Sequence, residues 1–134
     1  MSNLPAIPVA PTIEISQYWE AAARDVLLVP RCNACGKAYW YPRGFCPFCH
    51  STDIAWNESA GSGSIYSFTV AQRGQGPWEA AAPYVVAYVE LDEGPRVMTN
   101  IIQADPATLA IGQRVAAVFE ASGDYKILRF TPAG

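Results

Sequence analysis

The residues of this chain best suited to chemistry are four cysteines, Cys32, Cys35, Cys46 and Cys49. Their spacing, C-x2-C-x10-C-x2-C, forms two pairs with two residues between the members of each pair. Such a pair makes a tight turn in which both thiolates point at one metal ion, and two turns complete a tetrahedral four-sulfur shell. Disulfides are disfavoured in the cytosol, where we expect this chain, so the pattern predicts a metal site.

The predicted metal is zinc in a structural role, and iron is the alternative because four thiolates also suit a one-iron redox site. Gly36 follows the first pair and is suited to the positive φ that the exit of such a turn needs. His50 follows the second pair, but four thiolates already fill the shell, so we expect an exposed residue there. A closed shell leaves no position for water or substrate, which catalytic zinc requires.

No other group of residues in the sequence has the pattern of a catalytic site. His50 is the only histidine, no G-x-S-x-G motif occurs, and every cysteine is assigned to the metal. Asp92 and Glu93 lie in a predicted hairpin turn, where carboxylates are usually solvated. Without a nucleophile and a base to activate it, the chain is predicted to have no catalytic residues and to be a binding module.

The composition fits one packed domain of 134 residues, of which 51% are hydrophobic and 16% charged. The net charge of −3 argues against a protein that binds nucleic acid by neutralising phosphates. No apolar run approaches the roughly 20 residues of a membrane span. The first residues lack the basic and apolar regions of a signal peptide. We therefore expect a cytoplasmic protein without a membrane partner.

The elements that position the cysteines begin with a proline-containing arm over residues 1–13 and a helix over 17–25, for which Ser16 is the predicted N-cap. A short strand, 27–30, leads into the first cysteine pair. From residue 61 the hydrophobic period changes to two, and Tyr66, Phe68 and Val70 are expected on one face. Five strands are predicted, at 66–70, 84–91, 96–102, 115–119 and 125–130, with a helical turn at 105–106 before the fourth.

This order predicts a mainly β fold with an N-terminal helix, a metal-binding ribbon and a five-stranded OB-type barrel. Another small antiparallel sandwich is the alternative. Two segments, 39–48 and the long loop 71–83, combine aromatic and basic side chains, as interaction hot spots do. We expect them to face a partner or ligand. The alternatives are that the aromatics pack the ribbon against the barrel while the basic residues are solvated, and that Trp78 caps one end of the barrel. The candidate contact residues are Lys37, Trp40, Tyr41, Arg43, Phe45, Arg73 and Trp78.

The whole series of motifs resembles the DUF35 family, a rubredoxin-like zinc ribbon followed by an acyl-CoA-associated OB-fold. The resemblance rests on a Tyr18-Trp19 helix and on LVPRCNACG, YPR, CPFC and GSGSIYSFT, in that order. The later segments PYVVAYVELDEG and IGQRV also match, so the resemblance covers residues 14–130. The expected division of one compact unit is 1–26 for the arm and helix, 27–56 for the zinc ribbon and 57–134 for the OB-fold.

The resemblance implies a non-catalytic subunit of a thiolase-like acyl-CoA enzyme, such as a thiolase, aldolase or acyltransferase. The complex is then a hetero-oligomer whose thiolase-superfamily subunit supplies the catalytic Cys and His, while this chain helps to bind or position the CoA thioester. Lys37, Arg43 and Arg73 are candidates for contacts with the CoA phosphates, which need charged donors.

Two other functions are compatible with the elements, a nucleic-acid-binding zinc-ribbon and OB module and a one-iron electron-transfer protein. Against the first, residues 74–125 contain seven acidic and only two basic residues. The second predicts a red protein with a reversible visible spectrum, whereas zinc gives a colourless one.

Overall fold

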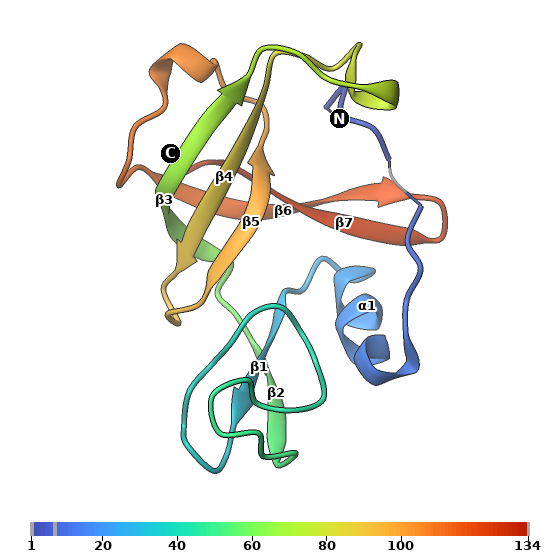
Figure 1. Ribbon diagram of the computed structural model, residues 1–134, viewed down its shortest axis with the longest axis vertical. Coiled ribbons are helices and arrows are strands. Elements are labelled where there is room, and N and C mark those ends of the chain that lie inside the picture. Colours follow the sequence, from blue (N-terminus) through green and yellow to red (C-terminus); the bar gives the residue numbers. More distant parts are fainter. Residues whose placement is uncertain (1, 7, 134) are drawn as a thin grey trace.

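The computed structural model of the chain describes residues 2–6 and 8–133 (Figure 1). The fold is mainly β, with one short helix, a ribbon that holds the four cysteines and a closed barrel, as predicted. The elements in order are η1 (Ile13–Ile15), α1 (Ser16–Ala22), β1 (Leu28–Cys32), β2 (Ile54–Glu58), β3 (Ser62–Ala71), η2 (Gly76–Trp78), β4 (Tyr84–Leu91), β5 (Arg96–Ile101), η3 (Pro106–Thr108), β6 (Arg114–Ser122) and β7 (Tyr125–Pro132). None of the helices in the described part of the chain has the length and apolar character that a membrane span requires.

The barrel closes in the order β3-β4-β5-β7-β6, because β6 pairs with both β7 and β3. All neighbours are antiparallel except β5 and β7. Its interior is filled by aliphatic side chains from every strand and by one aromatic ring, Phe130, that is completely buried. The predicted helical turn between β5 and β6 is present as η3, where the Asp105 carboxylate accepts a hydrogen bond from the Ala107 N–H at 3.0 Å. Closure is brief at two seams, since β5 and β7 pair only at Ile101 and Phe130, and β3 and β6 only over Ser62–Ser64.

A bulge in β3 changes which side chains face the core. The sequence predicts Tyr66, Phe68 and Val70 on one face, but the register with β4 shifts between Ile65 and Ser67. Ile65 is buried, Tyr66 is 48% exposed, and Phe68 and Val70 pack against the core. The prediction is wrong for Tyr66, because the extra residue of a bulge reverses the alternation of the strand.

The N-terminal helix is shorter than predicted and begins differently. Instead of covering 17–25 with Ser16 as its cap, α1 begins at Ser16 and ends at Ala22. The turn η1 continues directly into α1, so Ile15 occupies the N-cap position and makes no capping bond with its side chain. Past the other end, Asp25 takes a φ of +61°, the left-handed conformation that terminates helices.

The ribbon contains a strand that the sequence analysis missed. β2 pairs with β1 in antiparallel register, with Leu28 opposite Glu58 and Cys32 opposite Ile54. The sequence of β2 has three apolar residues followed by two polar ones, so apolar and polar residues do not alternate as they do in a recognisable strand. In the structure the first three are half-buried and the last two exposed. β2 crosses the boundary predicted at residue 56, and the division of the chain into units stays a prediction.

The ribbon and the barrel meet around α1, which lies beside β1 and contacts β7 (Figure 1). Tyr18 of α1 is buried in the same apolar cluster as the barrel core and packs edge-on against Trp40, with ring centroids 5.7 Å apart. Glu93 is exposed in its turn, as expected, and also accepts hydrogen bonds from Ser59 Oγ at 2.8 Å and from the Ala60 N–H at 3.1 Å. The β4–β5 turn therefore holds the segment that leaves the ribbon.

Candidate metal centre

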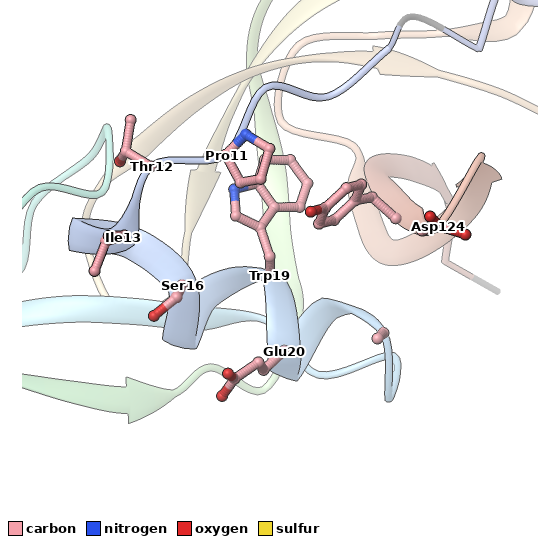
Figure 2. Close-up of a pocket in the computed structure, with 9 residues that line it drawn as sticks. Pro11, Thr12, Ile13, Ser16, Trp19, Glu20 and Asp124 are labelled. Carbon is pink, nitrogen blue, oxygen red and sulfur yellow. The ribbon is translucent and has the colours of Figure 1, made fainter.

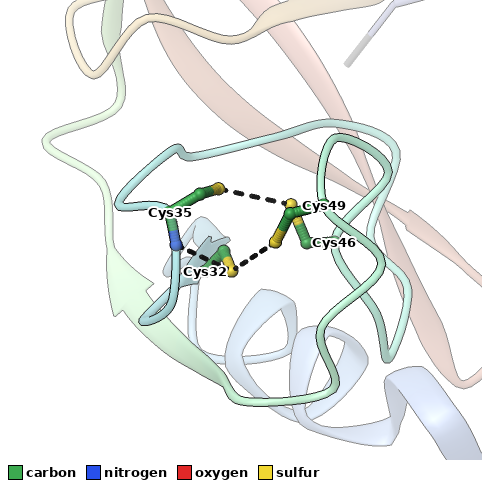
Figure 3. Close-up of side chains that lie close together, drawn as sticks. All are labelled: Cys32, Cys35, Cys46 and Cys49. Atoms are coloured by element: carbon green, nitrogen blue, oxygen red, sulfur yellow. Dashed lines mark hydrogen bonds between the residues drawn. The ribbon is translucent and has the colours of Figure 1, made fainter.

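The four cysteines come together at one end of the molecule, and their Sγ atoms all lie within 4.8 Å of one another (Figure 3). The Sγ atoms of Cys32 and Cys49 are 3.5 Å apart, and those of Cys35 and Cys46 are 3.6 Å apart. Tetrahedral coordination with a Zn–S bond of about 2.3 Å separates sulfurs by about 3.8 Å. The four side chains are thus positioned for metal binding, as their spacing predicts.

The two cysteine turns have the same backbone geometry. The carbonyl of Cys32 accepts a hydrogen bond from the Gly36 N–H, and that of Cys46 accepts one from the His50 N–H, both at 2.8 Å. Both residues at the exit of the turn are left-handed, with φ of +78° at Gly36 and +67° at His50. The positive φ predicted for Gly36 is confirmed. His50 is exposed and takes the same conformation without being glycine.

The repeated turn makes a matched pair of substitutions informative. Gly36→Ala is expected to lower the free energy of unfolding by about 1 kcal/mol, because a side chain at positive φ strains the backbone. The new Cβ would meet no atom closer than the Arg31 guanidinium at 4.0 Å, so strain and not a clash is the cause. His50→Gly removes the same strain and is expected not to destabilise. Thermal unfolding of both variants measures the difference, and equal losses would contradict this explanation.

Backbone N–H groups stabilise the thiolates of the inner cysteines. The Cys35 N–H donates to Cys32 Sγ at 3.4 Å and lowers the pKa of the Cys32 thiol. Burial alone would raise the pKa of Cys46, but hydrogen bonds from the backbone N–H groups of Cys49 and Phe48 outweigh it and lower the pKa to about 7. Such N–H···S bonds orient metal ligands and favour their charged form.

The pKa of the fourth thiol, Cys49, is raised by the neighbouring thiols. A backbone hydrogen bond from Ser51 lowers the pKa of Cys49, yet its contacts with the other thiols, that with Cys32 first, outweigh this and raise the pKa to about 11. Four thiolates at these distances repel one another, and a divalent ion offsets that repulsion. The donor set and its charge therefore fit a thiophilic metal such as zinc.

The metal turns are fixed to the rest of the chain on their inner side. Cys32, Cys46 and Tyr39 are buried together, and the Tyr39 hydroxyl donates to the Arg43 carbonyl at 2.7 Å. From η1, the Glu14 carboxylate accepts a hydrogen bond from the Gly44 N–H. The sequence analysis missed Glu14, since no local pattern pairs residues 30 positions apart.

Aromatic and basic side chains lie beside the metal turns, and we name Lys37, Tyr41, Arg43, Phe45 and Phe48 the ribbon surface. All are exposed except Arg43, which is half-buried and whose Nε donates to the Tyr41 carbonyl at 3.1 Å. Tyr41, Phe45 and Phe48 are 52%, 42% and 57% exposed. Lys37 Nζ lies 4.7 Å from the ring centroid of Phe48, and the Arg43 guanidinium lies 5.9 Å from that of Phe45. These contacts keep both cations beside apolar rings.

The other predicted contact residues lie elsewhere. Trp40 is half-buried against Tyr18 at the ribbon–barrel junction. Arg73 is exposed, and Trp78 is half-buried with its ring centroid 4.9 Å from that of Tyr84. The loop that contains Arg73 and Trp78, between β3 and β4, lies at the opposite end of the molecule from the metal turns (Figure 1). The two predicted contact segments therefore do not form one continuous site.

Comparison with protein families gives two adjoining matches. The model of the ChsH2 rubredoxin-like zinc ribbon domain matches residues 19–55, and that of the ChsH2 C-terminal OB-fold domain matches residues 56–120. Together the two matches take in the second half of α1, the cysteine turns and the barrel as far as β6. The ribbon and the barrel of this chain thus follow the order found in ChsH2.

Individual relatives agree with these matches. A Thermomonospora curvata protein, "Probable enoyl-CoA hydratase alpha subunit", is 38% identical over 117 residues, which are 87% of this chain and 36% of the relative. The chain thus spans about a third of that relative's length. A "DUF35 domain-containing scaffold protein" of Methanocaldococcus jannaschii is 36% identical over 72% of this chain and 69% of its own.

A solved structure extends the likeness to three dimensions. The chain matches "Ltp2-ChsH2(DUF35) aldolase" with a TM-score of 0.82 and 34% identity, over 95% of this chain and 100% of that one. The structural match, like the two family matches, covers both the ribbon and the barrel of this chain. The chain therefore belongs to the DUF35 family, with the rubredoxin-like zinc ribbon and OB-fold of ChsH2.

Proposed function

We propose that this chain is the non-catalytic, zinc-binding subunit of an acyl-CoA enzyme complex and helps to bind or position the CoA thioester. The observation that carries the proposal is the match to the ChsH2 component of an aldolase over 95% of this chain. A relative named as a subunit of an enoyl-CoA hydratase supports the same class of substrate. This chain spans 36% of that relative, and the proposal assigns the chemistry to the rest of the complex.

The proposed partner is a thiolase-superfamily subunit that supplies the catalytic Cys and His. This follows from the family resemblance and from the assignment of all four cysteines of this chain to the metal. Purification of the complex from the native host, with the associated subunit identified by mass, tests the proposal. A partner from another class, or a chain that purifies without one, would contradict it. The cytoplasmic location expected from reduced thiols belongs to the same proposal.

Zinc is the proposed metal, and its role is to join the two cysteine turns. Bound there, it supplies a rigid four-sulfur crosslink and no open coordination position. Cys32 and Cys46 hold it from the buried side, and Cys35 and Cys49 from the exposed side. The turns then hold the ribbon surface in a fixed shape.

The proposed contact residues for the partner or CoA are those predicted from the sequence. Among the described residues, neither Lys37 nor Arg43 has a carboxylate within ion-pair distance, whereas four barrel cations are paired: Arg96, Arg114, Lys126 and Arg129. Unpaired cations beside exposed aromatic rings suit anionic phosphates and an adenine ring. This favours the ribbon surface, with Trp40 behind it, as the CoA side of the complex. Arg73 and Trp78 then contact the partner at the far end.

Two alanine substitutions separate these contacts. Arg43→Ala is expected to weaken acyl-CoA binding by the complex about tenfold, since a charged hydrogen bond to phosphate is lost. Trp78→Ala is expected to weaken assembly and leave acyl-CoA affinity per assembled complex unchanged. Affinity is measured by calorimetry and assembly by size-exclusion chromatography, with the exposed Arg24→Ala as the matched control. If both variants assemble and bind CoA like the wild type, the contact assignment is wrong.

The isolated chain is expected to show no thiolase, aldolase or acyltransferase turnover. The physical reason is that a nucleophile and a base are assigned to the partner, not to this chain. Product formation from acyl-CoA is measured with the purified chain, with the partner, and with both together. Turnover by the chain free of partner would contradict the division of labour, while turnover only in the mixture would support it.

A further inference from the structure

A groove of about 370 Å³ lies away from the metal, between α1, the arm that precedes it and the turn from β6 to β7 (Figure 2). We name it the α1 groove, defined by Pro11, Ile13, Trp19, Glu20, Asp124 and Tyr125, with Thr12, Ser16 and Ala23 completing the lining. None of its residues belongs to the ribbon surface or to the loop that contains Arg73. It is therefore a separate feature of the molecule.

Apolar side chains form much of the α1 groove. Ile13 is 94% exposed, although an isoleucine is among the residues most often buried. Trp19 and Tyr125, which also line the groove, pack edge to face with ring centroids 5.7 Å apart. Tryptophan, tyrosine and an exposed aliphatic side chain around a hollow are typical of an anchor site for another protein.

The rim of the α1 groove is acidic. Glu20 on α1 and Asp124 on the β6–β7 turn lie on different sides of the groove (Figure 2), and none of the described lysine, arginine or histidine residues lines it. Within residues 2–6 and 8–133, neither carboxylate has a hydrogen bond or an ion pair. Other exposed carboxylates of the barrel, such as Asp92 and Glu90, are paired with arginines. Two unpaired carboxylates across an apolar hollow are complementary to an occupant that is apolar and positively charged.

One buried donor in the α1 groove also lacks a partner. Trp19 Nε1 is inaccessible to solvent and has no hydrogen-bond acceptor among the described residues. Its indole and Pro11 line the same groove (Figure 2). Residues 8–11 make no hydrogen bond to the rest of the described chain, and an external acceptor reaches the buried Trp19 Nε1 only if the groove opens. A buried donor without an acceptor is destabilising, and a peptide carbonyl would satisfy it.

We propose that the α1 groove docks a segment of a partner polypeptide in which an aliphatic side chain is flanked by lysine or arginine. Such a segment supplies an apolar side chain for Ile13, cations for Glu20 and Asp124, and backbone carbonyls for Trp19 Nε1. A nucleic acid would be repelled by the same carboxylates. The inference goes beyond the proposed function, because it does not require the partner to be a CoA enzyme.

The experiment uses the full, metal-loaded chain and a phage-displayed library of random dodecapeptides. Enriched peptides are synthesised, and their affinities are measured by calorimetry. We expect enrichment of lysine and arginine around an aliphatic residue. Glu20→Gln and Asp124→Asn should each weaken binding about threefold and together about tenfold, as expected for exposed ion pairs. Ile13→Ser should weaken it by a similar factor.

Two matched controls lie outside the groove. Glu79→Gln removes an exposed carboxylate, and Ile111→Ser removes an isoleucine that is 71% exposed. Both should bind the enriched peptides like the wild type, and circular dichroism shows whether all variants are folded. No enrichment, enriched peptides without basic residues, or affinities unchanged in the groove variants would each overturn the proposal. These outcomes are independent of whether a thiolase-type partner or acyl-CoA binds.

Discussion

Cys46→Ser is expected to remove the metal and unfold the ribbon while the barrel retains its strands. Metal content should fall from one ion per chain to well below one, and most of the protein should become insoluble. The free energy of zinc binding to zinc-finger peptides is about 10–16 kcal/mol and is also their folding energy. The inner side of the metal turns has only a small core of its own, Cys32, Tyr39 and Cys46 with Ile54 packed against them.

Elemental analysis and amide hydrogen exchange measure this outcome. In the fraction that stays soluble, loss of protection should be confined to residues 28–58, because β3 to β7 close without the ribbon. His50→Ala is the matched control, since the residue is adjacent to a ligand and exposed, and it should retain its metal. Full-length Cys46→Ser that is soluble, stable and metal-free would refute a structural role. A colourless zinc protein supports the assigned metal, whereas a red one would identify iron.

The second large effect is expected at an ion pair on the barrel. Arg129 is 6% exposed, and its Nε lies 3.2 Å from Glu120 Oε1. Its other nitrogens donate to Asn100 Oδ1 at 2.6 Å and to the Pro5 carbonyl at 3.2 Å. The Ser2 N–H and hydroxyl both donate to the Glu120 carboxylate at 2.7 Å. One network therefore joins the N-terminal arm to three barrel strands.

Glu120→Ala is expected to lower the free energy of unfolding by about 3 kcal/mol, because it leaves the buried Arg129 without its counter-charge. Chemical denaturation measures the loss. Glu90→Ala, which breaks the exposed pair with Arg96, is the matched control and should cost far less. Equal losses in the two variants would show that burial does not set the energy of the Glu120 pair.

The same carboxylate is expected to make stability depend on pH. Burial raises the pKa of Glu120, but the hydrogen bonds from Ser2 and the contact with Arg129 outweigh it and lower the pKa. Its stabilising contribution is therefore complete above the unfolded-state pKa of about 4.3 and is lost as the pH falls through the lower folded-state value. The stability difference between wild type and Glu120→Gln should be constant near neutral pH and shrink in acid. A difference that grows in acid would contradict this sign.

The metal centre and the strand order were predictable because their signals are local. Two residues between paired cysteines are enough to bring both thiolates to one ion, and Gly36 marks the exit of its turn without any distant contact. Alternating apolar residues with turns between them indicate strands, and five such strands with a helical turn at 105–106 indicate the barrel. Even the family was evident from the order of short motifs.

Other features depend on contacts that no short pattern records. The bulge that turns Tyr66 outward arises from pairing with β4, and β2 is held in place by β1. Glu14 reaches Gly44 only when η1 packs on the ribbon.

The Ser2–Glu120 bonds join residues 118 positions apart, and Arg129 reaches Pro5 across 124 positions. The α1 groove likewise combines residues 11–23 with 124 and 125. Sequence periodicity determines which elements form, because it reflects burial of one face. Barrel closure and the packing of α1 determine which polar groups meet, because only then do distant residues share one volume from which water is excluded.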